Sequence, residues 1–390
     1  MTMVINMKIG LALCYDTKNF GSQLQVLATV KKIESLGYET EIIRYKKKPT
    51  PRFIVQSSPR LLNKSFIKNK IHSRMKEKEL RAHPYIYRNV KIRNIRFEMF
   101  IETYLTNLSI PYNGWENLVK EANKNYDVFL CGSDQLWLPS NLGSHFYTLE
   151  FVEDKPKIAY ATSFGVSHIP WYQKNRTARY LNRFQSLSTR EIAGAKIIKD
   201  LTGKEVEVVC DPTLLFNDLQ WQEIIRDKEV IDEPYIFAYF LGNNEEHRKI
   251  ANHFKEETGL TLVSSPFLDN YVDIDKDFGN LQLYDLDAGD FVNLIRHAEY
   301  ILTDSFHGSV FSIIHHKKFM TFNRFREGSN SRNSRIDSLC QLLGLEGRRY
   351  DGQITDIYDD IDYKDVDQRL EKLRNESIAY LEKSLNGARK

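Results

Sequence analysis

Short, continuously apolar segments alternate with amphipathic helical segments through most of this sequence, and this alternation limits the possible folds more than any other feature. The apolar run KIGLALCYD at 8–16 is followed by the helical pattern LQVLATVKKIESLG at 24–37 and by YETEIIRY at 38–45, which has the pattern of a strand. Gly37 is a natural end for that helix. Strands that alternate with helices pair in parallel, and continuously apolar runs are typical of strands buried on both faces. We therefore predict an α/β fold built on parallel sheets.

Two sets of these units follow each other along the 390 residues. The first set continues through YDVFLCGSD, KIAYATSFG, QSLSTRE and EVEVVCDPTLL, and the second contains PYIFAYFLG, GLTLVSSP, EYILTDS and KKFMTFN. This organisation predicts two Rossmann-like domains whose parallel sheets face a cleft. We place the N-terminal domain at 1–225, with a basic helical insert at about 46–100, and the C-terminal domain at 226–350. Residues 351–390 are expected to form an acidic linker and a C-terminal amphipathic helix.

The basic insert holds most of the excess positive charge. Residues 44–96 contain 17 Lys or Arg and two acids, although the net charge of the whole chain is only +3. Such a block is either a solvated face or a cationic surface for an anionic membrane or a polyanionic acceptor. A basic amphipathic helix lying on an anionic leaflet is one form that this surface could take, because apolar residues approximate a helical stripe within it: Phe66, Ile67, Ile71, Met75 and Leu80. No nucleic-acid-binding motif accompanies the charge, so nucleic acid is not predicted as a partner.

Cysteine usage and hydropathy predict a cytoplasmic protein. The four cysteines are widely spaced and form no C-x-x-C pair, which is typical of buried, reduced thiols. No apolar run approaches the ~18 residues of a membrane-spanning helix. The opening MTMVINMKIGLALCYD fits a first buried strand better than a signal peptide. Any membrane contact is therefore expected to be peripheral, at the inner face.

Small polar residues follow two strands of the first set. After the first strand come Asn19 and Gly21, with Gln23 in the helix that begins there, and after YDVFLC come Ser133, Asp134 and Gln135. The first group offers helix-start N–H groups to a polar or anionic ligand, or it is a capped strand–helix turn. The second group could hydrogen-bond sugar hydroxyls, or it is an Asx-type turn. We predict that both groups can contact a polar ligand at the ends of these strands.

Two further motifs of the first set contain charged residues. In STRE, Arg190 could form a two-pronged pair with a carboxylate or phosphate, or it is an ordinary surface arginine. In VVCDPTLLF, the Asp–Pro pair is a turn signal, and we give it a structural role.

The second set carries its polar motif, TDSFHG, at the end of an apolar strand. Asp304, Ser305 and His307 do not form a nucleophilic triad, because triad members normally come from separate elements and no G-x-S-x-G is present. His307 is either a structural histidine or a general acid/base beside the helix that starts near Gly308. The adjacent pair His315 and His316 lacks zinc-ligand spacing. Downstream, Arg332 and Arg335 lie where a helix begins, which suits an anion.

In this order, seven stretches resemble the polysaccharide pyruvyl transferase family: NFGSQLQ, YDVFLCGSDQLW, KIAYATSFG, STRE, CDPTLL, TDSFHGSVFSIIHHKKF and SRIDSLCQLLGL. The resemblance spans residues 9 to about 346 and leaves the basic insert and the C-terminal tail uncovered. It implies a two-domain, GT-B-like glycosyltransferase architecture. It also implies transfer of pyruvate from phosphoenolpyruvate onto two hydroxyls of a hexose in a cell-surface polysaccharide or its lipid-linked precursor, giving a cyclic ketal.

The resemblance also implies roles for individual residues. The family's His-Gly maps onto His307 and Gly308, and its Arg-Glu onto Arg190 and Glu191. Many members place an arginine two residues before that histidine, where this chain has Ser305. We therefore predict His307 and Asp304 as catalytic residues. The polar residues that follow two strands of the first set are assigned to the acceptor: Asn19, Gly21, Gln23, Ser133, Asp134 and Gln135. The predicted donor-binding set is Arg190, Arg335, Ser305, Gly308, Ser309 and Arg332, with Arg324 as a further cation.

No cofactor and no metal are expected, since phosphoenolpyruvate is a substrate and no cluster of acidic metal ligands is evident in the sequence. Two other functions fit the same predicted fold. One is a nucleotide-sugar glycosyltransferase, and the other is a non-catalytic glycan-binding relative that docks through the basic insert.

Overall fold

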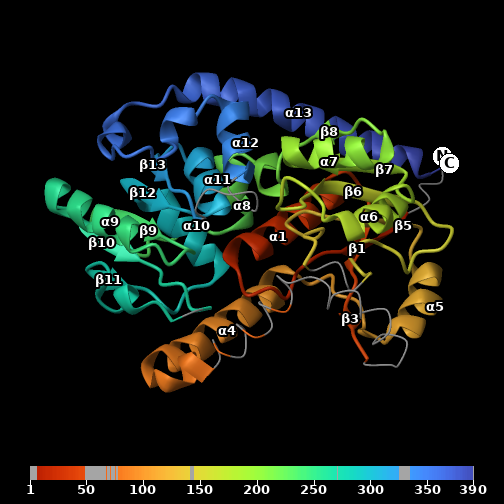
Figure 1. The fold of residues 1–390 in the computed structure, drawn as a ribbon, viewed down its shortest axis with the longest axis horizontal. Coiled ribbons are helices and arrows are strands. Elements are labelled where there is room, and N and C mark those ends of the chain that lie inside the picture. The colour runs from red at the N-terminus through yellow and green to blue at the C-terminus, as the bar shows by residue number, and fades with distance from the viewer. Residues whose placement is uncertain are drawn as a thin grey trace.

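A computed structural model describes residues 7–48, 67, 71, 75, 78–140, 145–269, 271–324 and 334–389. Its two main sheets are parallel, as predicted, and lie side by side with helices around them (Figure 1). The predicted α/β class with two Rossmann-like parallel sheets is therefore confirmed. The domain boundaries themselves stay a prediction. Most of the predicted insert stripe has its backbone in the described part, but Phe66 lies outside it.

The first sheet has six strands in the order β2-β1-β5-β6-β7-β8. Its strands are β1 (Lys8–Ala12), β2 (Glu39–Ile42), β5 (Val128–Cys131), β6 (Lys157–Thr162), β7 (Ser186–Thr189) and β8 (Glu207–Val208). After β1 the chain adds β2 on one side, and β5 later pairs with the other side of β1. The strand order therefore reverses between β1 and β5, and such a switch point opens a crevice at the carboxyl ends of the strands. The last predicted strand is shorter than expected, because EVEVVCDPTLL holds only the two residues of β8 before a 3-10 turn at Pro212–Leu215.

The second sheet has five strands in the order β11-β10-β9-β12-β13. They are β9 (Tyr235–Tyr239), β10 (Thr261–Ser264), β11 (Leu281–Gln282), β12 (Tyr300–Thr303) and β13 (Lys318–Thr321). The order reverses between β9 and β12, which gives this sheet its own switch point. A small parallel pair, β3 (Tyr45–Lys46) with β4 (Tyr112–Asn113), flanks the first sheet.

Helices connect the strands of both sheets. Those of the first half are α1 (Phe20–Ser35), α4 (Pro84–Tyr104), α5 (Trp115–Asn125), α6 (Lys174–Leu181), α7 (Ile192–Thr202) and α8 (Asp218–Ile224). Those of the second half are α9 (Glu245–Thr258), α10 (Ala288–His297), α11 (Phe306–Ile314) and α12 (Ser334–Leu343), followed by α13 (Tyr363–Gly387). Helices α7 and α9 each end at a glycine. Gly203 and Gly259 take the left-handed conformation that glycine adopts without strain.

Two helices tie the halves together. The long α13 runs along one side of the molecule past both sheets (Figure 1). Its last turns pack on the first half, where the Tyr380 hydroxyl donates to the carbonyl of Ala159 at 2.9 Å and Leu385 is fully buried. At the start of α1, the ring of Phe20 stacks on Phe291 of α10 with ring centroids 5.0 Å apart. These contacts fix the two switch points against each other.

Candidate functional site

A pocket of about 280 Å³ lies where the two switch points meet. Its walls come from the segments that follow β1, β5, β9 and β12, together with the start of α12. The lining residues are Thr17, Lys18, Asn19, Ser22, Asp134, Gln135, Leu241, Phe267, Asp269, Asp304, Ser305, Phe306, His307, Arg324, Arg335 and Ile336. We call this the cleft pocket. Its position is the one at which open α/β sheets bind ligands.

Arg190 forms the buried base of the site. Its side chain is 1% exposed, and it donates to Asp211 at 2.5 Å, to Asp134 at 3.1 Å and to the Ser133 hydroxyl at 3.3 Å. Burial alone would lower the pKa of Arg190, but Asp211 and Asp134 outweigh it and raise that pKa. Arg190 does not line the cleft pocket, but Asp134, one of the two carboxylates that it holds, does.

The same network keeps both aspartates ionised. Burial raises the pKa of Asp134, but Arg190, His307 and Arg335 outweigh this effect and leave the pKa at about 2. Burial likewise opposes ionisation of Asp211, yet His307 and Arg190 hold its pKa well below the usual value. Asp211 had been given only a turn role. It does cap the 3-10 turn, because Oδ1 accepts from the amide of Thr213 at 3.1 Å, and Oδ2 accepts from Arg190 and from the Ser133 hydroxyl.

His307 lies in the first turn of α11 and lines the cleft pocket. The helix is capped by Ser305, whose side chain accepts from the amide of Gly308 at 3.3 Å. The His307 Nε2 atom is 3.8 Å from Asp211 Oδ1, and it has no hydrogen-bond partner among the described residues. Gly21 approaches the other edge of the ring so closely that a Cβ there would be 2.0 Å from Nδ1. The imidazole thus lies between the Asp211 carboxylate and Gly21, and its buried Nε2 atom makes no hydrogen bond to the described residues.

Arg335 is the pocket cation with the fewest compensating charges. Its guanidinium lies 5.7 Å from the centroid of the Phe306 ring, and with the Gln135 amide oriented toward it, the amide oxygen accepts from Nη2 at 3.2 Å. No carboxylate of the described residues is within ion-pair distance of Arg335. Burial, and after it the positive charge of Arg190, lower the pKa of Arg335 to about 10. A buried cation beside a second cation favours an anion in the pocket.

Asp304 is held by backbone rather than by a charged partner. Its two oxygens accept from the amides of Leu241 at 2.6 Å and Gly242 at 2.8 Å, which joins the ends of β12 and β9. Burial raises the pKa of Asp304, although Arg324 and these amides oppose the rise. Both oxygens are occupied, so the surroundings of Asp304 fit a residue that positions the start of α11.

The segment after β1 supplies polar residues to the pocket wall, among them Asn19 and Ser22. Asn19 caps α1 by accepting from the Ser22 amide at 3.1 Å, and the Ser22 hydroxyl donates to Asp134 at 2.7 Å. Gln23 points elsewhere: it is fully buried and donates to the carbonyl of Phe97 at 3.0 Å. Helix geometry explains the difference, because neighbouring residues on a helix face directions about 100° apart. We therefore no longer place Gln23 at the acceptor.

The remaining predicted residues support the site from behind. Ser133 is fully buried against Arg190 and Asp211, and Ser309 donates to the carbonyl of Ser305 at 3.2 Å. Glu191 is also fully buried, and it accepts from Ser163 and from the amides of Phe164 and Gly165, which holds the loop after β6. Arg332 lies outside the described residues.

Sequence reasoning missed several lining residues, among them Lys18, Phe267, Asp269 and Phe306. Phe306 packs between two cations, with its ring centroid 4.8 Å from the guanidinium of Arg190 and 5.7 Å from that of Arg335. The only sequence signal for it was its place inside the TDSFHG motif. Lys18 and Asp269 had no signal, because each depends on how a loop folds over the pocket.

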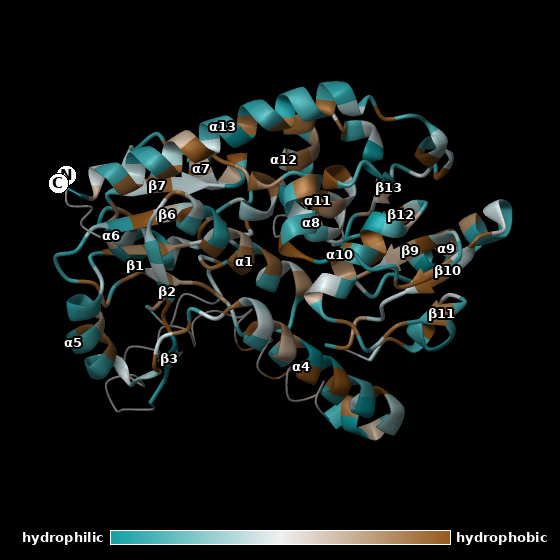
Figure 2. Cartoon of the chain, turned by 180° about the vertical axis from the view of Figure 1, so that it is seen from behind, coloured by the Kyte–Doolittle hydropathy of each residue, from teal (hydrophilic) through white to brown (hydrophobic). Residues whose placement is uncertain are grey.

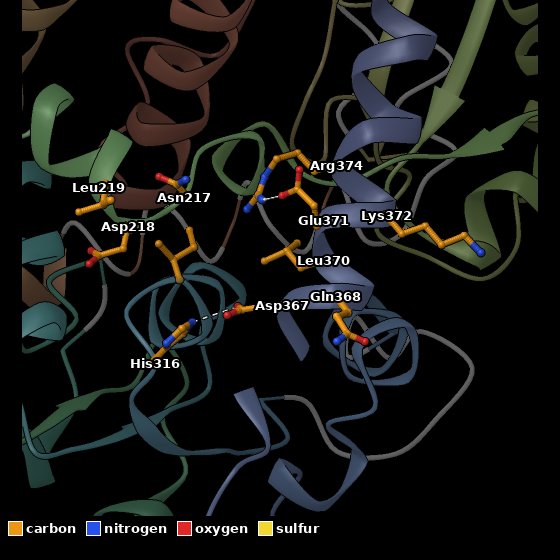
Figure 3. Close-up of a pocket in the computed structure, with 11 residues that line it drawn as sticks. Asn217, Asp218, Leu219, His316, Asp367, Gln368, Leu370, Glu371, Lys372 and Arg374 are labelled. Atoms are coloured by element: carbon orange, nitrogen blue, oxygen red, sulfur yellow. Dashed lines mark hydrogen bonds and ion pairs between the residues drawn. The ribbon is translucent and has the colours of Figure 1, made fainter. Parts of the chain in front are cut away.

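A larger pocket of about 640 Å³ lies elsewhere, between the start of α8, the end of α11 and α13 (Figure 3). It contains none of the predicted residues, and two pairs of charged groups within it contact each other: His316 with Asp367 at 3.0 Å, and Arg374 with Glu371. We therefore place the candidate site in the smaller cleft pocket. Within the described part of the chain, no cluster of three or more His, Cys, Asp or Glu side chains could hold a metal ion.

Comparisons with known proteins agree with this geometry. The family model for polysaccharide pyruvyl transferase matches residues 19–324. No curated protein matches the chain. UDP-GlcNAc 2-epimerase from Neisseria meningitidis, solved with UDP-GlcNAc bound, is similar in structure with a TM-score of 0.53 at 8% identity, covering 98% of this chain and 100% of that one. Heptosyltransferase WaaC from E. coli aligns at a TM-score of 0.37 and 9% identity, over 87% and 99% of the two chains. The first likeness supports the GT-B-like arrangement of the two sheets.

Proposed function

The chain belongs to the polysaccharide pyruvyl transferase family, and from this premise we propose that it transfers pyruvate from phosphoenolpyruvate to two hydroxyls of a saccharide, forming a cyclic ketal. The observation that carries the proposal is the pairing, in one pocket, of an available imidazole with a cation that has no carboxylate beside it among the described residues. His307 and Arg335 both line the cleft pocket. Phosphoenolpyruvate brings a phosphate of about −1.5 to −2 charges and a carboxylate.

Charge supports the donor assignment. Arg335 and Arg324 line the pocket on the side of the second half, and the pKa of Arg335 is lowered to about 10 by burial and by Arg190. An anion at this position would offset both the burial and the repulsion. The capped start of α11 adds its positive dipole end beside His307. Many family members have an arginine two residues before the histidine, where this chain has Ser305. We propose that Arg335 binds the donor in place of that arginine.

Space supports the acceptor assignment. The opposite wall of the pocket consists of Asn19, Ser22, Asp134 and Gln135 from the first half. Asp134 stays ionised, so its oxygens can accept hydrogen bonds from sugar hydroxyls. We propose that the acceptor enters between this wall and His307. The sugar is a hexose of a cell-surface polysaccharide or of its lipid-linked precursor.

The reaction balances with these residues alone. Protonated His307 gives its proton to the methylene carbon, which makes the central carbon electrophilic. A sugar hydroxyl then attacks that carbon, and His307 takes the hydroxyl proton, which restores its starting state. The bond to phosphate then breaks, the second hydroxyl closes the ketal, and its proton leaves with the phosphate. Imidazole has a reference pKa near 6.5, so it can exchange a proton in each turnover. Asp211 orients the ring from 3.8 Å, and no cofactor is required by these steps.

The test measures phosphate released from phosphoenolpyruvate with and without a saccharide acceptor extract, together with acid-labile pyruvate on the product. Release should need both substrates and should fall by about 10²-fold or more in His307→Ala, the range of a general acid/base. His316→Ala is the matched control, because His316 lies outside the cleft pocket and pairs with Asp367. Release at the normal rate in His307→Ala would remove His307 from the mechanism.

A nucleotide-sugar activity on the same fold is separated by ligand binding. Under the proposal, phosphoenolpyruvate raises the melting temperature of the protein and UDP-GlcNAc does not. The reverse result would favour the glycosyltransferase alternative over pyruvyl transfer.

A further inference from the structure

Exposed large apolar side chains are concentrated in one stretch of the chain, residues 67–110. Of the twelve large hydrophobic residues exposed in the described part of the chain, seven lie between 67 and 110: Ile67, Ile71, Met75, Tyr85, Ile95, Met99 and Ile110. Single exposed hydrophobic residues are ordinary, but a contiguous group on a soluble chain marks an interaction surface. None of these residues belongs to the cleft pocket.

Helix α4 carries the best described part of this surface, and its two faces differ. The inner face buries Phe97 and Phe100, and the ring of Phe97 lies 5.1 Å from that of Phe20. On the outer face Ile95 and Met99 are one turn apart and are 57% and 47% exposed. Brown and teal segments alternate along α4, as expected for a helix that carries both apolar and polar residues (Figure 2).

The charges of α4 are divided between the same two faces. Arg93 and Arg96 point inward and pair with carboxylates of the second half, Arg93 with Asp269 at 2.7 Å and Arg96 with Asp290 at 2.7 Å. Arg88 and Lys91 are exposed on the outer side. The outer side from Tyr85 to Met99 therefore combines apolar residues with the exposed cations Arg88 and Lys91, while the acid in this stretch, Glu98, pairs with Lys18. We call Tyr85, Arg88, Lys91, Ile95 and Met99 the outer α4 face.

The sequence that leads into and includes most of α4 is strongly basic. The block 44–96 contains 17 cationic residues against Glu77 and Glu79, in a chain of net charge +3. Apolar side chains flanked by Lys and Arg are complementary to a bilayer that exposes anionic headgroups. A protein partner could cover the apolar side chains, but protein interfaces do not in general carry the large excess of negative charge that would match this block.

Helix α4 also lies at the mouth of the cleft pocket. Glu98 accepts from Lys18 at 3.2 Å, and Arg93 donates to Asp269 at 2.7 Å. Lys18 and Asp269 line the pocket from opposite halves of the molecule. A surface that α4 binds is therefore held close to the pocket entrance.

We propose that the outer α4 face docks the protein on an anionic lipid membrane, with the cleft pocket next to the bilayer surface. In the described part of the chain no helix is long and apolar enough to cross a membrane. Attachment is thus peripheral and reversible, and it depends on salt. This docking goes beyond the proposed transfer reaction, and it would bring the pocket to an acceptor carried on a lipid.

Co-sedimentation with vesicles tests the proposal. The full-length protein is mixed with vesicles of phosphatidylcholine containing phosphatidylglycerol, and separately with pure phosphatidylcholine. We expect binding to the anionic vesicles only, decreasing as NaCl is raised. The double variant Ile95→Glu/Met99→Glu and the double variant Arg88→Glu/Lys91→Glu should each bind about tenfold or more weakly.

The matched control is Leu219→Glu on α8, because Leu219 is 69% exposed but lies far from this block in the sequence and belongs to the other pocket. It should bind as the wild type does, and equal melting temperatures should show that the variants are folded. If a variant fails to fold, the proposal is still tested by how wild-type vesicle binding depends on anionic lipid and on salt.

The proposal is overturned if wild type binds both vesicle types alike, binds neither, or if the Ile95→Glu/Met99→Glu variant keeps full binding. Capture by a soluble anionic polysaccharide without vesicle binding would also overturn it, in favour of a polyanionic acceptor. Phosphoenolpyruvate binding is measured on the same samples without vesicles. A failure of the membrane proposal is thereby distinguished from a failure of the proposed reaction.

Discussion

Gly21 lies against the imidazole of His307, so close that a Cβ on Gly21 would be 2.0 Å from the ring nitrogen Nδ1. Gly21 belongs to the first turn of α1 in the first half, and His307 to the first turn of α11 in the second. The position of the proposed general acid/base thus depends on contact between the two halves. A side chain at Gly21 would move the ring or separate the halves.

Gly21→Ala should therefore lower phosphate release by roughly 10²-fold, the scale of a displacement of about 1 Å at a reacting group. The melting temperature should change less than the activity does. Gly347→Ala is the matched control, because no atom would lie within 4 Å of the added Cβ. Normal activity in Gly21→Ala would show that the ring position is not critical.

Arg335→Gln should weaken phosphoenolpyruvate binding, because it removes the pocket cation that has no carboxylate partner in the described part of the chain. Charge-assisted hydrogen bonds contribute about 1.5–3 kcal/mol, so the dissociation constant should rise roughly 10- to 100-fold. Titration calorimetry measures it. Arg369→Gln should bind normally, since Arg369 is exposed on α13 and pairs with Asp365 at 2.7 Å. Unchanged binding in Arg335→Gln would place the donor elsewhere.

The Asp134–Arg190 pair should stabilise the protein in a defined pH range. The folded-state pKa of Asp134 is lowered to about 2, against about 3.9 for an unfolded-chain aspartate. A lowered carboxyl pKa stabilises the fold fully above the unfolded value, and this contribution is lost as the pH falls toward the folded value. The difference in unfolding free energy between wild type and Asp134→Asn should thus be constant above about pH 5 and shrink toward pH 2. Urea titrations at several pH values measure it. A difference that grows with acidity would contradict the assigned ionisation.

The last turns of α13 should contribute to the stability of the first half. Leu385 is fully buried there, so Leu385→Ala should lower the unfolding free energy by about 2–5 kcal/mol. Glu382→Ala, on the exposed face of the same helix, should change it by less than about 0.5 kcal/mol. Denaturant titration compares the two variants. Equal, small effects would show that α13 is detachable.

Much of the site could be predicted because polar residues interrupt apolar strands at their ends. Asn19, Asp134, Asp304 and His307 all follow strands, and parallel strands place their ends on one edge of a sheet. All four line the cleft pocket. The sequence could not assign directions within the helix that follows β1, where Ser22 faces Asp134 but Gln23 faces Phe97.

The sequence by itself determined the alternation of strands and helices, the parallel sheets and the candidate histidine, because these depend on local periodicity and on the position of polar residues along the chain. Only the tertiary structure decided that Arg190 is buried behind the pocket, that Asp211 joins it there, and that Arg335 lines the pocket without a carboxylate partner among the described residues. Pairing among these charges depends on packing between segments 21 to 201 residues apart, and no local pattern encodes which charge is neutralised and which is left over.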